Sequence, residues 1–242
     1  MKVATKVVAT AALLALVSAP ASRAAEATVG LDVASAYVFR GVTLNDGFVA
    51  QPYMNVSGLP VDLGVWGNID IDDYDGALND GAFSEIDVTA SYGLPIEGIN
   101  SAIGYAEYTY PNGGEADREF SLTLGLDEVL APTLGVYYGV DGAIEENVYA
   151  SFGVSHSVEV EEGIELGLGA LVGYLYPETG EDGFHQGEVS ASLAWNAVTL
   201  GVKYVYQIDD EVLVDSMVDA DGARSLGYDV EVIGTLSLSH SF

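Results

Sequence analysis

The sequence contains 242 residues, enough for one large all-β domain or two small ones. Lys and Arg total 7 against 37 Asp and Glu, a formal net charge of -30. Such a chain lacks the cationic surface that the phosphates of nucleic acid require, so we expect no nucleic acid partner. A hydrophobic content of 49% predicts a folded chain, and a sequence without cysteine excludes disulfides, thiolate metal sites and cysteine nucleophiles.

The first segment has the features of a secretory signal peptide. Two lysines precede an apolar run, and small residues follow before the first acidic residue. This order predicts cleavage after Ala24, with Ala21 or Ala27 as alternatives. An uncleaved anchor helix fits less well, because a membrane span needs roughly 20 apolar residues. We therefore expect a signal peptide over residues 1–24 and an exported domain over residues 25–242.

Apolar residues in the exported part recur with period two, which is typical of strands. Within 198–204 every even position is apolar, and the odd positions are polar or glycine. Most of the segments have about the length that a tilted strand needs to cross a bilayer. Twelve strands are predicted on this basis, at residues 28–42, 48–57, 61–70, 84–93, 102–110, 119–126, 133–141, 147–157, 164–176, 187–195, 198–206 and 228–242.

Alternation alone does not separate a soluble sandwich from a membrane barrel, because both have one apolar face and one polar face. The connections favour the barrel, since compact ones alternate with longer ones that are acidic and contain glycine. Tight turns at one end and long loops at the other are typical of outer-membrane barrels. The compact connections are 58–60, 94–100, 127–131, 159–163 and 196–197, and the longer ones include 72–82, 112–118, 178–184 and 207–226.

Aromatic residues gather where strands meet the long loops. A membrane interface favours this arrangement, because a phenol keeps its hydroxyl in water and its ring in the acyl boundary. Core packing is the alternative, and it would scatter aromatics along the strands. The residues are Tyr37, Phe39, Tyr108, Tyr110, Tyr137, Tyr138, Tyr174, Tyr176, Tyr204 and Tyr206, with Phe48, Phe120 and Tyr228 on returning strands.

The polar face carries charges that a dry core would not tolerate, because unpaired buried carboxylates cost several kcal/mol each. A soluble sandwich could place them in solvent, and only the loops and aromatics argue otherwise. We therefore predict an all-β, transmembrane, antiparallel up-and-down barrel of about 12 strands with both termini periplasmic. The predicted pore-lining residues are Asp32, Arg40, Asp62, Glu85, Asp87, Glu107, Glu119, Glu165, Glu188, Lys203, Asp229 and Glu231, and Asp70 shares their face.

The order of several motifs resembles the TorF-type porins, a family catalogued as conserved hypothetical outer-membrane proteins. These motifs are the opening 35–42 (SAYVFRGV), Gln51-Pro52, the acidic strand 85–88 and the Tyr-x-Tyr-Pro entry to a loop. The terminal segment 236–242 also looks like the signal that the outer-membrane assembly machinery reads, although His240 stands where a hydrophobic residue is usual. The resemblance implies a β-barrel porin in the outer membrane of a Gram-negative bacterium and brings no substrate with it.

No enzyme is expected, and neither catalytic residues nor cofactors are assigned. Of the three histidines, none has a spacing to serine and acid that singles out a triad. Glycine-rich phosphate loops need a following helix, which the pattern does not predict. The acidic loops 70–76 and 219–222 offer oxygen ligands without the EF-hand spacing, so we interpret them as solvated loops. Weak divalent binding beside lipopolysaccharide is the alternative, and no metal site is assigned.

The inward charges lead to a functional hypothesis. Arg40 and Lys203 are expected to pair with acids such as Asp32 and Glu231, and the surplus carboxylates would leave a negative wall that attracts cations. We therefore expect a passive diffusion channel for small hydrophilic solutes with cation preference. The alternative is a non-conducting barrel with a structural, adhesive or divalent-cation-binding surface role, which a plug of inward aromatics would favour. The expected partners are outer-membrane lipid, lipopolysaccharide, the assembly machinery and small solutes.

Overall fold

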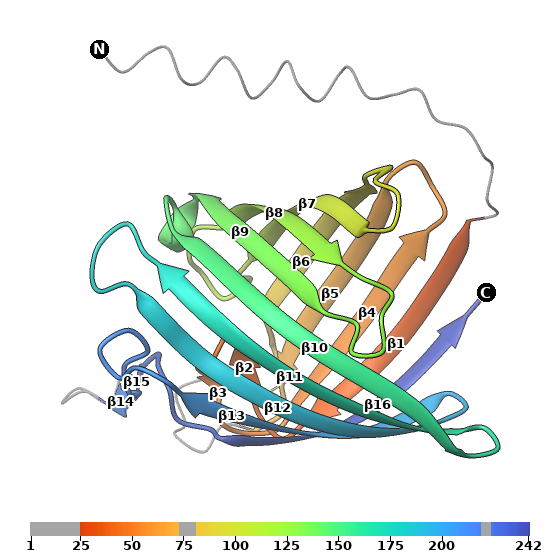
Figure 1. Cartoon of the computed structure of the whole chain (residues 1–242). Coiled ribbons are helices and arrows are strands. Elements are labelled where there is room, and N and C mark those ends of the chain that lie inside the picture. Colours follow the sequence, from red (N-terminus) through yellow and green to blue (C-terminus); the bar gives the residue numbers. More distant parts are fainter. Residues whose placement is uncertain (1–24, 73–80, 219–223) are drawn as a thin grey trace.

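The computed structural model describes residues 25–72, 81–218 and 224–242, and the predicted signal peptide, 1–24, lies outside them. Twelve antiparallel strands close into one barrel in the order β1-β16-β13-β12-β11-β10-β9-β8-β7-β6-β5-β4 (Figure 1). Their bounds are β1 Glu26–Ala34, β4 Val49–Ser57, β5 Asp62–Asp70, β6 Phe83–Gly93, β7 Asn100–Thr109, β8 Asp117–Gly125, β9 Thr133–Asp141, β10 Val148–Glu161, β11 Ile164–Tyr176, β12 Gly183–Trp195, β13 Val198–Gln207 and β16 Val232–Ser241.

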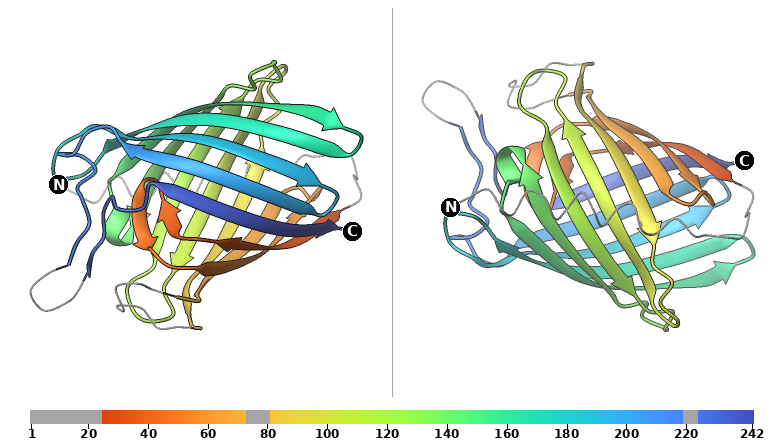
Figure 2. Two further views of the ribbon diagram at one scale, coloured as in Figure 1. Left: turned by 90° about the horizontal axis from the view of Figure 1, so that it is seen from below. Right: turned by 90° about the horizontal axis from the view of Figure 1, so that it is seen from above.

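In the part of the chain that the structure describes, four short strands and one 3-10 turn are not part of the barrel wall. They are β2 Tyr37–Phe39, β3 Val42–Asn45, η1 Gly142–Ile144, β14 Met217–Val218 and β15 Arg224–Ser225. We call the end of the barrel where β1 begins and β16 ends the terminal end, and the opposite end the loop end. The pair β14 and β15 projects from the loop end (Figure 2). The described residues contain no helix long and apolar enough to span a membrane.

The predicted barrel of twelve strands is confirmed, and two predicted strands are too long. The segment 28–42 was expected to be one strand, but β1 ends at Ala34, which pairs with Val49 of β4. The chain then leaves the wall and forms the β2–β3 hairpin with Arg40 and Gly41 in its turn. The last predicted strand, 228–242, begins four residues too early, because Val232 is the first residue of β16.

The two faces of the barrel have the polarity of a membrane protein. Residues paired across neighbouring strands point to the same face. The register therefore assigns each wall residue to the inward or the outward face all the way around the ring. The outward face exposes large apolar side chains on every side, including Leu31, Leu63, Val65, Val88, Leu122, Leu168, Val189, Leu200 and Leu238. The inward face carries Asp32, Gln51, Asp87, Ser121, Ser190 and their cross-strand partners. An apolar band outside and polar groups inside define a transmembrane β-barrel.

The predicted aromatic girdle holds for only part of the aromatic set. Phe120, Tyr138, Tyr176, Tyr204 and Tyr206 lie on the outward face near the loop end and are exposed. Rings pack there in pairs, such as Tyr204 with Tyr206 at 6.2 Å between centroids. The girdle prediction is wrong for a second set, which register and contacts place inside the barrel. That set contains Tyr37, Tyr108, Tyr110 and Tyr137.

A matched pair of substitutions on β12 tests which face meets lipid. Val189 lies outward and is 47% exposed, whereas Ser192 lies on the inward face three positions along the same strand. We expect Val189→Arg to lower the free energy of unfolding by about 2–4 kcal/mol in lipid, because a guanidinium at bilayer depth is poorly solvated. Ser192→Arg should cost less than about 1 kcal/mol. Denaturant titration in lipid vesicles measures both, and equal losses would contradict the assignment of the faces.

Candidate functional site: the hairpin across the lumen

The β2–β3 hairpin folds into the lumen, the space that the barrel encloses. Its base packs on the wall from which it emerges, where Ala36 and Tyr37 join Val49, Val205 and Ile233 in a small buried cluster. Thr43 of the hairpin is fully buried and pairs with Gly227 in the connection before β16. This apolar cluster inside a largely polar lumen depends on the hairpin, which supplies Ala36 and Tyr37. The hairpin is therefore packed like a protein core.

The tip of the hairpin reaches the opposite wall. The Arg40 side chain contacts Glu119 of β8, Tyr137 of β9 and Tyr149 of β10. In the closed strand order, β9 and β10 lie halfway around the ring from β1 and β4, between which the hairpin is inserted. The hairpin thus crosses the full bore near the loop end.

The Arg40 guanidinium is held by one carboxylate and three rings. Its two terminal nitrogens donate to the two oxygens of Glu119 at 3.0 and 2.7 Å, a bidentate pair. The carbon Cζ lies 4.5 Å from the ring centroids of Tyr137 and Tyr149 and 4.7 Å from that of Phe39. The Glu119 side chain is only 4% exposed. A charge-assisted pair and ring faces that attract cations together compensate the desolvation of the guanidinium.

The turn of the hairpin is strained at an ordinary residue. Arg40 has a φ of 49° and Gly41 a φ of 84°, and two positive values are typical of the two-residue turns that close hairpins. Glycine is required at the second position, since a Cβ there would lie 2.8 Å from Leu213 and 2.9 Å from Gln186. A non-glycine residue with positive φ persists when its surroundings hold it, and the contacts of Arg40 provide that restraint.

Hydrogen bonds fix the two flanks of the hairpin to β5 and β6. The Tyr37 hydroxyl donates to Glu85 at 2.9 Å, and its ring lies 5.4 Å from that of Trp66. On the other flank, the Asn45 amide donates to Asp70 at 2.8 Å. Asp70 Oδ1 also accepts from Asn68 at 2.9 Å. The hairpin is therefore tied on both flanks as well as at its tip.

The wall around the hairpin is rich in buried carboxylates. Asp70, Glu85, Asp87, Asp117 and Glu119 are each less than a tenth exposed. Asp117 accepts from the Ala143 amide at 2.5 Å and from the Tyr110 hydroxyl at 2.7 Å. In the described structure one buried oxygen of Asp70 and one of Asp87 have no hydrogen-bond partner. Just beyond β7, burial and then the bond to Asp117 raise the pKa of the Tyr110 phenol well above its ordinary value.

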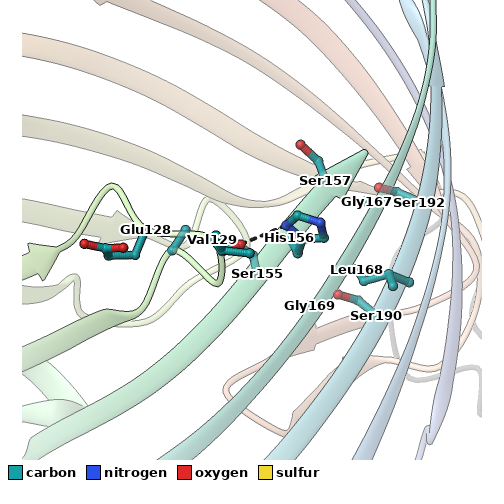
Figure 3. Close-up of a pocket in the computed structure, with 11 residues that line it drawn as sticks. Glu128, Val129, Ser155, His156, Ser157, Gly167, Leu168, Gly169, Ser190 and Ser192 are labelled. Atoms are coloured by element: carbon teal, nitrogen blue, oxygen red, sulfur yellow. Dashed lines mark hydrogen bonds between the residues drawn. The ribbon is translucent and has the colours of Figure 1, made fainter. Parts of the chain in front are cut away.

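The terminal half of the lumen is a polar vestibule. Small hydroxyl residues of β10 and β12, Ser155, Ser157, Ser190 and Ser192, lie on the inward face and line a cavity of about 550 Å³ (Figure 3). The connection between β8 and β9 borders the cavity. Its Val129 carbonyl forms a hydrogen bond of 2.8 Å with His156 Nδ1. Most of these serines are exposed to solvent. The lumen is thus lined by solvent-exposed serines in its terminal half and crossed by the hairpin near its loop end.

The register places most of the predicted charged residues on the inward face of the strands, although their role in lining a pore stays a prediction. These residues are Asp32, Asp62, Glu85, Asp87, Glu119, Glu165, Glu188 and Lys203. Among these, Asp62 and Glu165 lie near the terminal end and are exposed. Lys203 pairs with Glu188 at 3.4 Å.

The other predictions need correction. Glu107 lies on the outward face opposite Val88 and pairs with Arg118, because its parity on β7 is the reverse of the expected one. Asp229 and Glu231 lie in the connection before β16 and not in a strand. Arg40 lies in the hairpin turn and pairs with Glu119, whereas Asp32 or Glu231 was expected. The hairpin contacts two inward aromatic residues of the wall, since Tyr37 packs on Trp66 and Arg40 on Tyr149.

Sequence reasoning missed the hairpin and the rings that hold its tip. The signal was present in 37–45, where Arg-Gly separates two short β-prone segments, as a two-residue turn does. The adjacent pair Tyr137-Tyr138 was also informative, since successive residues of a strand face opposite sides. Only one of the two can face lipid, and the other must enter the lumen.

The two ends of β5 offer a test of how firmly the hairpin is anchored. We expect Asp70→Ala to cost about 1–3 kcal/mol of stability, because it removes the acceptor of the buried Asn45 amide and one of the two acceptors of the buried Asn68 amide. Amide hydrogen exchange of residues 42–47 should accelerate more than that of β13. Asp62→Ala is the control, since Asp62 is exposed and accepts one hydrogen bond, from Gly58. Slow exchange of the hairpin in Asp70→Ala would show that this anchor is dispensable.

The closed barrel with an apolar exterior and a polar interior belongs to the class of transmembrane β-barrels. A solved membrane protein from work on in-meso crystallization has this fold with a TM-score of 0.51, at 8% identity, covering 90% of this chain and 84% of that chain. The outer membrane protein Omp33 of Acinetobacter baumannii aligns at 11% identity and a TM-score of 0.44, covering 90% and 97% of the two chains. An outer membrane channel from Pseudomonas putida F1 aligns at 12% identity and a TM-score of 0.43, covering 93% and 97%.

Residues 18–137 match the family described as a bacterial protein of unknown function, Gcw_chp. No curated protein matches the chain. The family that matches carries a different name from the TorF-type porins, so that resemblance stays a prediction from the motifs.

Proposed function

We propose that the protein is an outer-membrane channel for small hydrophilic solutes, that it prefers cations, and that the β2–β3 hairpin forms its constriction. The outer membrane is the proposed location because the barrel has an apolar exterior and residues 1–24 are predicted to be an export signal. Both termini would then lie on the periplasmic side, with the vestibule open to the periplasm.

The observation that carries the proposal is the charge of the inward face. Among the described residues of the barrel strands, Lys203 is the inward cation, and it is already paired with Glu188. Inward carboxylates such as Asp32 and Glu165 have no cationic partner in the described structure. A wall of this sign raises the local concentration of cations and repels anions over a Debye length of about 8 Å at physiological salt.

A salt gradient across a planar bilayer tests the selectivity. We expect the refolded exported domain to give discrete current steps whose reversal potential indicates K⁺ preference over Cl⁻. Glu159→Gln with Glu165→Gln removes a cross-strand pair of exposed inward acids at the terminal end and should lower that preference roughly twofold.

Glu107→Gln is the matched control, because Glu107 lies on the outward face beside Arg118. This substitution should leave the reversal potential unchanged. Anion preference in the unaltered protein would contradict the proposed selectivity.

A second candidate function follows from the hairpin itself. A segment that crosses the bore, packs in a buried cluster and is anchored at three places is also what a permanently closed barrel requires. The protein would then serve a structural or adhesive role through its acidic loops. Bilayers that stay silent with a folded barrel would favour this candidate over the channel.

A further inference from the structure

We propose that the wall pocket occupied by Arg40 is a binding site for guanidinium groups, and that a guanidinium-bearing solute entering it displaces the hairpin tip. The pocket consists of Glu119 and the rings of Tyr137 and Tyr149, and the guanidinium of Arg40 fills it as an internal ligand. The site would make guanidinium compounds the solutes of the channel proposed above. A role of the site in transport therefore rests on that proposed function.

The pocket belongs to the wall and not to the hairpin. Glu119, Tyr137 and Tyr149 lie on β8, β9 and β10, and only the ring of Phe39 comes from the hairpin. The wall also orients its own carboxylate, since the Tyr108 hydroxyl donates to Glu119 Oε1 at 2.7 Å. Tyr149 is in turn held by a hydrogen bond of 2.7 Å from Gln186. These groups would remain in place if Arg40 moved away.

The geometry selects a planar cation. Two nitrogens of Arg40 meet two oxygens of Glu119, which is the parallel arrangement that a guanidinium makes and an ammonium cannot. Ring faces within 4.5 Å of Cζ favour a flat, weakly hydrated cation for the same reason. An alkylammonium of equal charge should therefore bind much more weakly.

Acidic residues around the pocket attract an incoming cation. Asp87 is 8% exposed, and its Oδ1 has no hydrogen-bond partner in the described structure. Asp117, on the same strand as Glu119, is 7% exposed. One guanidinium therefore stands near more than one buried acidic side chain, and this setting favours a cation over an empty pocket. Displacing the strained tip at Arg40 would also release its positive φ.

Emptying the pocket by mutation tests the site directly. We expect ethylguanidinium to raise the thermal midpoint of the detergent-folded Arg40→Ala variant saturably, by about 3–5 °C at ten times the dissociation constant. Ethylammonium at the same concentration and ionic strength should give less than a third of that shift. The unaltered protein should need at least about tenfold more ethylguanidinium, because the tethered Arg40 competes for the pocket.

Two further variants decide whether the shift comes from this pocket. Arg40→Ala with Glu119→Gln keeps the cavity and removes the carboxylate, and it should lose the response. Arg118→Ala removes an arginine whose partners lie outside the lumen and should behave like the unaltered protein. No saturable shift in Arg40→Ala, or equal shifts in all variants, would overturn the proposal. If Arg40→Ala does not fold, Arg40→Lys, which retains a charge without the bidentate geometry, takes its place.

Bilayer recordings separate this proposal from the channel function. Ethylguanidinium added to the unaltered protein should increase the current at least about twofold as the hairpin tip is displaced. Saturable binding with silent bilayers in every variant would reject the channel and keep the site. Current steps without any ethylguanidinium binding would keep the channel and reject the site.

Discussion

Replacing residues 35–48 with Asn-Gly should raise the single-channel conductance at least about fivefold, because the hairpin is the segment that crosses the bore. The replacement is compatible with the barrel, since Ala34 of β1 and Val49 of β4 are direct cross-strand partners. A two-residue turn can join such partners, and Asn-Gly adopts the positive φ values that the turn requires. The wall strands and their register are left intact.

Excision also removes two of the six residues of the buried cluster inside the barrel. Val49, Val205 and Ile233 would then face water instead of Tyr37 and Ala36. At about 25 cal/mol per Å² of apolar surface, losing the contacts of these side chains costs a few kcal/mol. The wall hydrogen bonds of the barrel should keep it closed, and far-UV circular dichroism with heat-modifiable gel mobility checks this.

The control shortens a different loop at the same end of the barrel. Replacing residues 177–182 between β11 and β12 with Asn-Gly removes exposed chain outside the lumen and should leave the conductance within about twofold. Equal conductance before and after excision of the hairpin would show that the constriction lies elsewhere. Bilayers that stay silent after excision would reject the channel itself and leave the structural role.

The strands were predictable because a membrane barrel repeats one local rule. Each wall strand alternates faces with period two, so segments such as 164–176 and 198–206 could be placed within a residue of β11 and β13. The alternation depends on nearby residues only. Strand order followed as well, since each strand pairs with its neighbours in the chain and the ends close the ring.

The hairpin was not predictable by the same rule, because its residues have the β-prone composition of a wall strand. Tyr37, Val38 and Phe39 are all apolar or aromatic, and the residues of β3 alternate apolar with polar ones as wall strands do. The hairpin differs from a wall strand in the residues that it contacts. Ala34 and Val49 close the wall pair, and the segment between them then finds Glu85, Asp70 and Glu119 across the lumen. Such long-range contacts leave no periodic mark in the sequence.

The prediction of which charged residues face the lumen failed at Glu107 for a related reason. Glu107 carries the same type of side chain as Glu119, but parity puts one outside and the other inside. Tyr105 and Glu107 share the outward face, where the hydroxyl of Tyr105 donates to Glu107 at 3.0 Å. Near the loop end a charged residue can face outward, because the polar interface lies there and Arg118 completes the pair. An acidic residue on a strand is therefore not by itself evidence for the lumen.

Replacing Arg40 of the hairpin by alanine should lower the free energy of unfolding much more than replacing Arg118 of β8. Arg40 is 19% exposed and its partner Glu119 is 4% exposed, so Arg40→Ala leaves an unpaired carboxylate in a dry place. The expected loss of unfolding free energy is about 3–5 kcal/mol. Arg118 is 35% exposed, and its partners Glu107 and Asp141 are 33% and 54% exposed. Solvent screens these pairs, so Arg118→Ala should cost far less than Arg40→Ala.

Denaturant titration in lipid vesicles measures both losses, and a third variant identifies their cause. Adding Glu119→Gln to Arg40→Ala should recover part of the loss, because the amide removes the buried charge and can still accept from Tyr108. Adding Glu107→Gln to Arg118→Ala should change little. If the two single variants lose equal stability, Glu119 has access to water in the unaltered protein. The hairpin tip would then not seal the bore at β8, and the increase in conductance on its excision should be correspondingly small.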